Sequence, residues 1–324
     1  MNHIDRQDNI NNQTSKQVRV GVHIGMPKTG TTSLQELYFN RHPDLAYLGQ
    51  TNIWDKPDAK NMLKGLILGD NSDVSKEEIH KIRDDALARK SALVISDEAL
   101  TMGEFMLRSG RWPIVSNHYT AAKQIKQLLG DVHILIVIRN QADWLYSWHR
   151  QGLKTAKYSE TEYNCWLKYD LGESAERLFN LLNYDELYDA YVSVFGKELV
   201  HLKIYEQYMD NLEQIAIEFI SCLGLNPADY PGLMGNEKRN ITSDKFNGVP
   251  KYLQKFIRLS PIRTIVKMIP DGMRGRIRKA VEVQRQYGNM SDSQRNAILK
   301  RYEQGNRVLF DRLGIEIDSS AYFA

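Results

Sequence analysis

The sequence predicts an α/β fold of three layers, in which a central parallel sheet is flanked by helices, with a mainly helical C-terminal region. Short apolar strands alternate along the chain with segments of helical period, which implies a parallel sheet covered on both faces. The run Val132–Ile138 is apolar on both faces, as is typical of a strand inside such a sheet. A loop of glycine and small hydroxyl residues joins the first strand to the first helix.

Four strands are expected, and they span Val18–Ile24, Ala92–Ile95, Val132–Ile138 and Leu199–Ile204. Apolar residues alternate with other residues in the first of them, at the period of a strand. Helices are expected after residue 33, from Ser75, over 121–129, from about 142, within 160–195 and over 211–223. Residues 50–75 are expected to be irregular, and no clear strand is expected beyond about 226.

The helix from Ser75 has the clearest local signals. Ser75 and Glu78 have the spacing of a capping box, in which each side chain bonds a backbone amide of the first turn. Ile79, Ile82 and Ala86 then recur at helical spacing and define the face that we expect to be buried.

The domain organisation follows from composition. Residues 1–17 are polar and rich in Asn and Gln, so we expect a disordered tail, followed by a single domain over 18–324. Its core is expected at 18–225, with a helical, basic extension at 226–324. The chain has 324 residues, 42% of them hydrophobic, which is enough to build a core.

Charge and cysteine content exclude several classes of protein. With 43 Lys and Arg against 40 Asp and Glu, the net charge is +3, which argues against a polybasic nucleic-acid binder. Two cysteines, Cys165 and Cys222, make neither a disulfide scaffold nor a four-cysteine zinc site, and fit a reducing compartment. The N-terminus lacks an apolar signal core, so a cytoplasmic protein is expected.

The strongest functional signal is Pro27-Lys-Thr-Gly-Thr-Thr-Ser33, between a strand and a helix. An anion at this position meets unpaired backbone amides and the positive end of the helix dipole. Gly30 permits close approach of the backbone, the hydroxyl residues Thr29 and Thr31–Ser33 offer donors, and Lys28 adds a positive charge. The fold is therefore expected to be of the P-loop type, with an anion such as phosphate bound by this loop.

The loop differs from the Walker A pattern, which places Lys directly after the second glycine. Gly25 and Gly30 have the Walker spacing, but Thr31 follows Gly30 and Lys28 precedes it by two residues. A P-loop kinase or NTPase is still an alternative, because Leu93–Glu98 resembles a Walker B strand. A nucleotide-binding protein without catalysis is a further alternative.

Residues Met26–Ser33 resemble the 5′-phosphosulfate loop of sulfotransferases that use 3′-phosphoadenosine 5′-phosphosulfate (PAPS). His23-Ile24-Gly25, which precedes the loop, is similar to many bacterial members of that family. The resemblance implies that Lys28 interacts with the phosphosulfate. It also implies that Thr29, Gly30, Thr31, Thr32 and Ser33 hold the 5′-phosphate.

A second motif resembles the 3′-phosphate site of the same family. Arg139 follows an apolar strand and Ser147 comes eight residues later, so that a guanidinium and a hydroxyl are available to a phosphate. Ile204-Tyr205-Glu206 resembles a further family element, and the resemblance implies that Tyr205 lies near the adenine. By its position, the segment 236–240 is the candidate for a late nucleotide-binding loop, with Lys238 or Arg239 in contact with the nucleotide.

The resemblance implies transfer of a sulfuryl group from PAPS to a hydroxyl, most plausibly of a carbohydrate or glycolipid. A base must then accept the hydroxyl proton. Glu98 is the first candidate and Asp97 the second, because both follow the strand 92–95 at the same sheet edge as the loop. His23, His118 and His149 are weaker candidates. No metal is required, since no familiar metal-ligand spacing is present.

Residues 245–285 carry eleven Lys or Arg and two acids, interleaved with apolar side chains. Three interpretations are open for this segment. Its basic side chains either face solvent while its apolar side chains pack on the core, or bind the surface of an anionic membrane, or line a cleft for an acidic glycan. Acceptor loops are expected within 40–75, 100–118 and 152–175. Aromatic side chains in or next to these loops either offer surfaces for sugar rings or pack in the core. They are Trp54, Trp112, Trp148, Tyr158 and Trp166.

Overall fold

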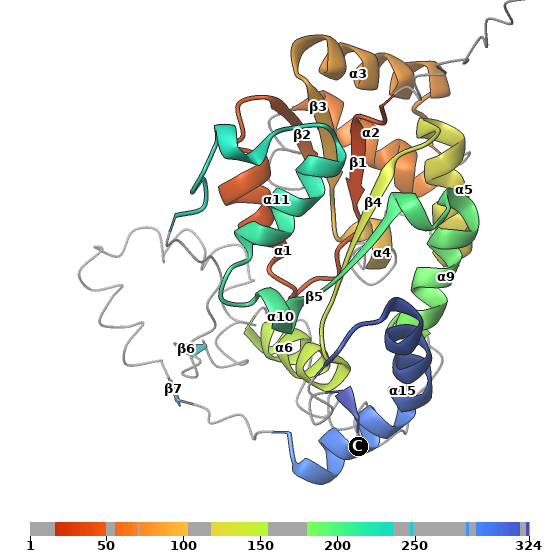
Figure 1. Cartoon of the computed structure of the whole chain (residues 1–324). Coiled ribbons are helices and arrows are strands. Elements are labelled where there is room, and N and C mark those ends of the chain that lie inside the picture. Colours follow the sequence, from red (N-terminus) through yellow and green to blue (C-terminus); the bar gives the residue numbers. More distant parts are fainter. Residues whose placement is uncertain are drawn as a thin grey trace, which may run out of the picture.

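A computed structural model describes residues 17–49, 56–69, 72–102, 118–154, 180–235, 290–317 and 322–323, and the backbone of two short strands (Figure 1). Within 149–154 only the backbone is described. The predicted tail over residues 1–16 lies outside this part of the chain. The same holds for nearly all of the basic segment 245–285, for Lys238 and Arg239, and for Cys165.

The centre of the molecule is a five-stranded sheet in which every pair of neighbouring strands is parallel. Its strands are β1 (Val20–His23), β2 (Leu45–Gly49), β3 (Ala92–Ser96), β4 (His133–Ile138) and β5 (Val200–Ile204), in the spatial order β2-β3-β1-β4-β5. The predicted parallel sheet is therefore confirmed. The apolar run after Val132 is the interior strand β4, paired with β1 on one side and β5 on the other.

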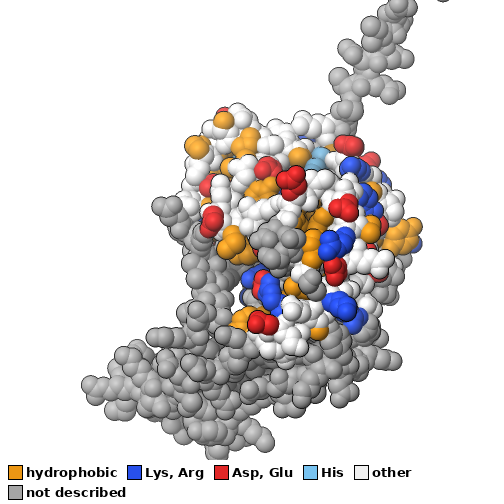
Figure 2. Space-filling model, turned by 60° about the horizontal axis from the view of Figure 1, so that its bottom comes forward, with side chains coloured by type: hydrophobic (Ala, Val, Ile, Leu, Met, Phe, Trp, Pro, Cys, Tyr) orange, Lys and Arg blue, Asp and Glu red, His pale blue; other side chains and the backbone are white. Residues whose placement is uncertain are grey.

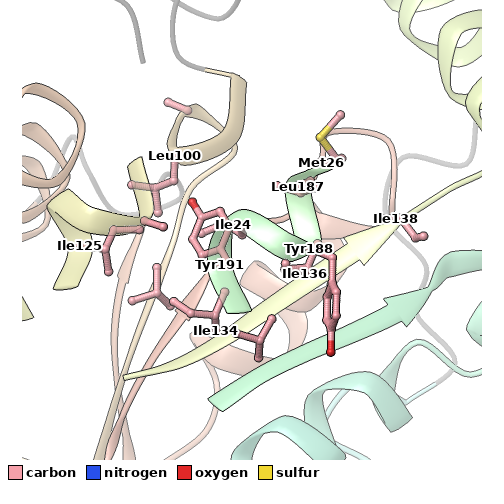
Figure 3. Packing of buried hydrophobic residues seen from close by; sticks show 14 of the residues in the cluster. Ile24, Met26, Leu100, Ile125, Ile134, Ile136, Ile138, Leu187, Tyr188 and Tyr191 are labelled. Atoms are coloured by element: carbon pink, nitrogen blue, oxygen red, sulfur yellow. The ribbon is translucent and has the colours of Figure 1, made fainter. Parts of the chain in front are cut away.

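Alternate residues of the strands enter two separate hydrophobic clusters, one on each face of the sheet. Ile134, Ile136 and Ile138 of β4 pack in the larger cluster, whereas Leu135 and Val137 pack in the smaller one. Figure 3 shows the larger cluster, where β4 side chains meet Leu187, Tyr188 and Tyr191 from helix α9 (Tyr184–Phe195). Two buried faces explain why β4 has no polar alternation.

Helices cover both faces and complete the three layers (Figure 1). The smaller cluster is covered by a helix that begins as α1 (Thr31–Ser33) and continues as a π-helical segment η1 (Leu34–Phe39), and by α11 (Glu213–Cys222). The larger cluster is covered by α2 (Pro57–Leu68), α3 (Lys76–Arg89), α5 (His118–Leu129), α6 (Gln141–Lys154), α9 and α15 (Asp292–Leu313). Short helical turns lie at α4 (Ala99–Met102), η5 (Lys197–Leu199), α10 (Tyr205–Tyr208) and η6 (Pro227–Asp229).

Local signals set the helix ends. The Ser75 hydroxyl accepts from the Glu78 amide at 3.1 Å, as predicted, whereas the Glu78 carboxylate accepts from the Asn61 side-chain amide at 2.7 Å. Ile79, Ile82 and Ala86 are buried, as predicted for α3. Gly130 and Gly224 follow α5 and α11 with φ of 78° and 83°, a backbone region that favours glycine.

Two expectations about the N-terminal half and one about the C-terminal half are wrong. Residues 57–68 are the helix α2, whose buried Ala59, Met62, Leu63 and Leu66 have helical spacing, so 50–75 is not irregular throughout. Strand β2 is not among the predicted strands, although all of its residues except Ala46 are buried. Beyond 226, strands β6 (Asn247–Gly248) and β7 (Val283–Gln284) pair antiparallel.

The strand order places a topological switch point between the carboxyl ends of β1 and β4. After β1 the chain leaves toward β2 on the η1 side of the sheet, and after β4 it leaves through α6 on the opposite side. Ligands of open α/β sheets bind at such a switch point. The loop after β1 and the residue Arg139 after β4 are therefore brought to one place. In the described part of the chain no helix is long and apolar enough to cross a bilayer.

Candidate active site

The side chains of Trp144, Thr29 and Thr101 hold the backbone of the loop after β1 by hydrogen bonds. The Trp144 indole on α6 donates to the Pro27 carbonyl at 2.5 Å, and the Thr29 hydroxyl donates to the Met26 carbonyl at 2.5 Å. The Thr101 hydroxyl donates to the Ile24 carbonyl. Trp144 and Thr29 are fully buried. The Thr29 side chain therefore shapes the loop from inside.

The loop backbone is folded for close approach of a ligand. Lys28 has a φ of 71° and Gly30 a φ of 79°, and Lys28 is the one non-glycine residue with positive φ in the described chain. A lysine in this region stores backbone strain of about 1–2 kcal/mol, which is typical of ligand-binding loops. Gly30 is the N-cap of α1, and no side chain makes a capping hydrogen bond there, as suits a helix start that binds an anion.

Burial divides the loop residues into two sets. Lys28, Gly30 and Thr32 are partly exposed, whereas Thr31 and Ser33 are buried. A methyl group added at Gly30 would lie 2.8 Å from Leu212 and 3.4 Å from the Tyr205 ring. The glycine is thus required both by its positive φ and by this packing.

Arg139 and Tyr205 lie against the loop at the switch point, although they are far apart in the sequence. The Arg139 guanidinium donates from Nη1 to the Lys28 carbonyl at 2.9 Å. The same guanidinium lies over the Tyr205 ring, 5.0 Å from its centroid. Three of the predicted nucleotide-site residues therefore form one cluster. Ser147 lies on α6, half buried, one turn beyond Trp144.

Sequence reasoning missed the residues that orient Arg139. The Tyr184 hydroxyl donates to the Arg139 carbonyl at 2.6 Å. The Glu206 carboxylate accepts from the Asn140 amide at 2.9 Å and from the Tyr322 hydroxyl at 2.7 Å. Glu206 thus ties the end of β5 to the end of β4 and to the C-terminal segment. The position of Glu206 directly after Tyr205 was the sequence signal that could have identified Glu206 as part of the site.

The two candidate bases have different surroundings at the end of β3. Glu98 is half buried and accepts a hydrogen bond from the Thr31 hydroxyl. Its carboxylate also interacts electrostatically with the Lys28 ammonium. Burial raises the pKa of Glu98, and Thr31 and Lys28 oppose that rise. Asp97 is 5% exposed, and it accepts from the Ala99 amide at 2.7 Å. Glu98 therefore faces the loop, whereas Asp97 bonds the start of α4.

Burial raises the pKa of Asp97 to about 7, with a hydrogen bond from Ala99 opposing and Glu98 reinforcing the rise. A raised carboxyl pKa contributes stability below the unfolded pKa and loses it as the pH rises through the folded pKa. We expect Asp97→Asn to exceed the native protein in free energy of unfolding by about 2–4 kcal/mol at pH 8. The difference should shrink toward pH 4. Urea unfolding at both pH values measures it, and a difference independent of pH would contradict a buried, protonated Asp97.

The histidine candidates are placed less favourably. His23 is fully buried beside Phe39, its Nδ1 lies 2.8 Å from the Ser96 hydroxyl, and burial lowers its pKa to about 3. His118 is 9% exposed, and burial lowers its pKa to about 4. The side chain of His149 lies outside the described part. Of the aromatic residues considered for the acceptor, Trp148 is the one within the described part of the chain. It is buried and stacks on Trp144 with 5.5 Å between the ring centroids.

The described residues on the face seen in Figure 2 are mixed in charge. Figure 2 turns the lower end of Figure 1 forward, and there Lys and Arg side chains lie among Asp and Glu side chains. At the loop, the cations Lys28 and Arg139 lie together, since Arg139 donates to the Lys28 carbonyl.

Comparison with known proteins identifies the family. A model of the sulfotransferase domain matches residues 22–247. The fold is similar to that of a sulfotransferase from Alicyclobacillus acidocaldarius, with a TM-score of 0.54 and 13% identity over 93% of this chain and 97% of that chain. No curated protein gives a significant match. Since the family match includes the loop, Arg139 and Tyr205, the chain belongs to the sulfotransferase family and is an enzyme of that class.

Proposed function

We propose that the protein transfers the sulfuryl group of PAPS to a hydroxyl of a carbohydrate or glycolipid. The family implies PAPS as the co-substrate. The observation that carries the proposal is the cluster of Lys28, Arg139 and Tyr205 at the switch point of the sheet, with Arg139 hydrogen-bonded to the Lys28 carbonyl at 2.9 Å. A nucleotide with phosphates at two positions needs two anion sites and an aromatic surface, and these residues supply them.

PAPS fits the residues of the loop because no side chain caps the start of α1 and because Lys28, Gly30 and Thr32 are partly exposed. When bound, PAPS supplies the sulfuryl group and a phosphate leaving group. Lys28 and the amides at the start of α1 then hold negative charge on the leaving side. Arg139 and Ser147 would hold the 3′-phosphate, and Tyr205 would lie against the adenine.

The acceptor side needs a group that takes up the hydroxyl proton. Glu98 has this role in the proposal, because its carboxylate lies half buried beside Thr31 and near Lys28. Thr31 donates to Glu98 and so favours its ionised form, which is the form that accepts a proton. Sulfuryl transfer, like phosphoryl transfer, needs in-line positioning of the acceptor and stabilisation of charge on the leaving group. In this proposal Glu98 serves the acceptor side and Lys28 the leaving side.

Isothermal titration tests the donor specificity. We expect 3′-phosphoadenosine 5′-phosphate, the product of PAPS, to bind more tightly than ATP. The loop lacks the Walker lysine that supports magnesium–triphosphate binding, and Arg139 is available to a 3′-phosphate. Equal or tighter binding of ATP, or magnesium-dependent ATP turnover, would favour a kinase or NTPase instead.

Arg139→Ala tests the second phosphate site. The guanidinium should make charge-assisted bonds to the 3′-phosphate, each worth about 1.5–3 kcal/mol, so the variant should lose about 10–100-fold in affinity for 3′-phosphoadenosine 5′-phosphate. Binding of adenosine 5′-phosphate, which lacks the 3′-phosphate, serves as the control and should change much less. A similar loss for both nucleotides would mean that Arg139 supports only the shape of the loop.

The acceptor is identified by transfer of radiolabelled sulfate from PAPS to extracted carbohydrates and glycolipids. Labelling of the carbohydrate or glycolipid fraction supports this proposal, and labelling of peptides or small phenols alone would contradict it. A cytoplasmic location and a peripheral contact of segment 245–285 with an anionic membrane belong to the same proposal, since a glycolipid hydroxyl is presented at a membrane surface.

A further inference from the structure

Three side chains with soft or borderline metal-ligand atoms meet at the end of the sheet opposite the phosphate loop. His133 is the first residue of β4, His201 is the second residue of β5, and Cys222 is the last residue of α11. Leu135 pairs with His201 in the parallel register, so His133, Leu135 and His201 point to the same face of the sheet. This is the face that α11 covers.

The ligand atoms of these three residues all lie within 4.8 Å of one another. His133 Nδ1 and His201 Nε2 are 2.9 Å apart, and the two rings stack with 5.1 Å between centroids. Tetrahedral zinc has bonds of about 2.0–2.1 Å to nitrogen and 2.3 Å to sulfur, which gives edges of about 3.3 Å between nitrogens and 3.5 Å between nitrogen and sulfur. Small side-chain shifts therefore bring the three atoms to zinc distances.

The charge state of the cluster suits a metal. Burial lowers the pKa of His133, and burial, with smaller contributions from His133 and Lys203, lowers the pKa of His201 to about 4. An imidazole binds a metal through the lone pair of its neutral form. The Lys203 ammonium, whose charge acts on His201, forms an ion pair with Glu218. Its positive charge is therefore largely balanced.

Cys222 completes the set from the helix. Its thiol donates to the Glu218 carbonyl one turn earlier at 3.3 Å, which holds the sulfur on the sheet-facing side. Burial raises the pKa of the Cys222 thiol, and Lys203 opposes that rise. The thiol must lose its proton to bind a metal, and a metal ion itself favours this loss. All three residues are half buried, so a metal has access from solvent.

We propose that His133, His201 and Cys222 form a zinc site that ties α11 to strands β4 and β5, separate from the nucleotide site. Two imidazoles and one thiolate suit zinc, and three protein ligands leave the fourth position to water. The same three elements reach the nucleotide site at their other ends. There, β4 is followed by Arg139, β5 by Tyr205, and Leu212 before α11 packs at Gly30. A metal here would strengthen the framework on which the nucleotide residues are placed.

Cobalt(II) titration of the untagged, chelator-treated full chain tests the site. We expect one cobalt ion per chain, with the charge-transfer absorption of a cobalt–thiolate bond, and displacement of cobalt by added zinc. Cys222→Ser should abolish this absorption and weaken zinc binding at least about 10–100-fold. Cys165→Ser is the matched control, because it removes the other cysteine, and it should retain the absorption. Zinc should raise the Tm of the native protein and of this control, and not of Cys222→Ser.

A second variant covers the case in which Cys222→Ser does not fold. His201→Gln keeps a polar side chain on β5 and should weaken cobalt binding by a similar factor. Absence of the cobalt–thiolate absorption in the native protein would overturn the proposal. So would its persistence in Cys222→Ser, or undiminished affinity in His201→Gln. None of these readouts involves sulfate transfer, so the result is independent of the proposed function.

Discussion

Lys28→Ala is expected to reduce sulfuryl transfer by at least about 10²–10³-fold in kcat, the cost of removing one donor that stabilises charge in a transition state. Lys28 lies at the partly exposed apex of the loop, beside the start of α1, where negative charge on the leaving phosphate would develop. The affinity for 3′-phosphoadenosine 5′-phosphate should fall less than kcat. Transfer of labelled sulfate and nucleotide titration measure the two effects.

Lys28→Gly separates the charge from the backbone. Lys28 has a φ of 71°, and glycine adopts this conformation without strain, so this variant should be at least as stable as Lys28→Ala and fold with the native loop. It should nevertheless be as inactive as Lys28→Ala. Recovery of activity in the glycine variant would mean that the loop conformation, and not the ammonium, was lost on substitution by alanine.

Glu98→Gln is expected to lower kcat by about 10²–10⁴-fold, the range for removal of a general base. Glutamine keeps the shape of the side chain and can still accept from the Thr31 hydroxyl, so the loop should be retained. The matched variant Asp97→Asn should keep activity within a few-fold, because Asp97 bonds the Ala99 amide. The opposite ranking of the two variants would assign the base to Asp97.

The pH dependence gives an independent check on Glu98. Burial raises the pKa of Glu98 above the ordinary glutamate value, and the base is active only when ionised. Activity of the native enzyme should therefore fall as the pH is lowered through this raised pKa, at a pH above the usual glutamate range. In Glu98→Gln the residual activity should lack this acid limb. A limb of unchanged position in the variant would place the titrating group elsewhere.

Much of the fold and of the donor site was predictable because local rules govern it. The period of two in β1, the apolar faces of β4 and the capping signal at Ser75 each act within a few residues. The phosphate loop is also local, since its glycine, hydroxyl residues and lysine are contiguous and lie between a strand and a helix. Composition and spacing therefore predicted the α/β class, which the structure confirms, and a candidate anion site at this loop.

Other features depend on which strands become neighbours, and only the tertiary structure decided them. The order β2-β3-β1-β4-β5 brings Arg139 to the Lys28 carbonyl. Burial and hydrogen bonds, not sequence position, distinguish Glu98 from the adjacent Asp97. His133, His201 and Cys222 have no recognisable spacing because they come from three elements. Their meeting follows from parallel register and helix packing, which are interactions between distant parts of the chain.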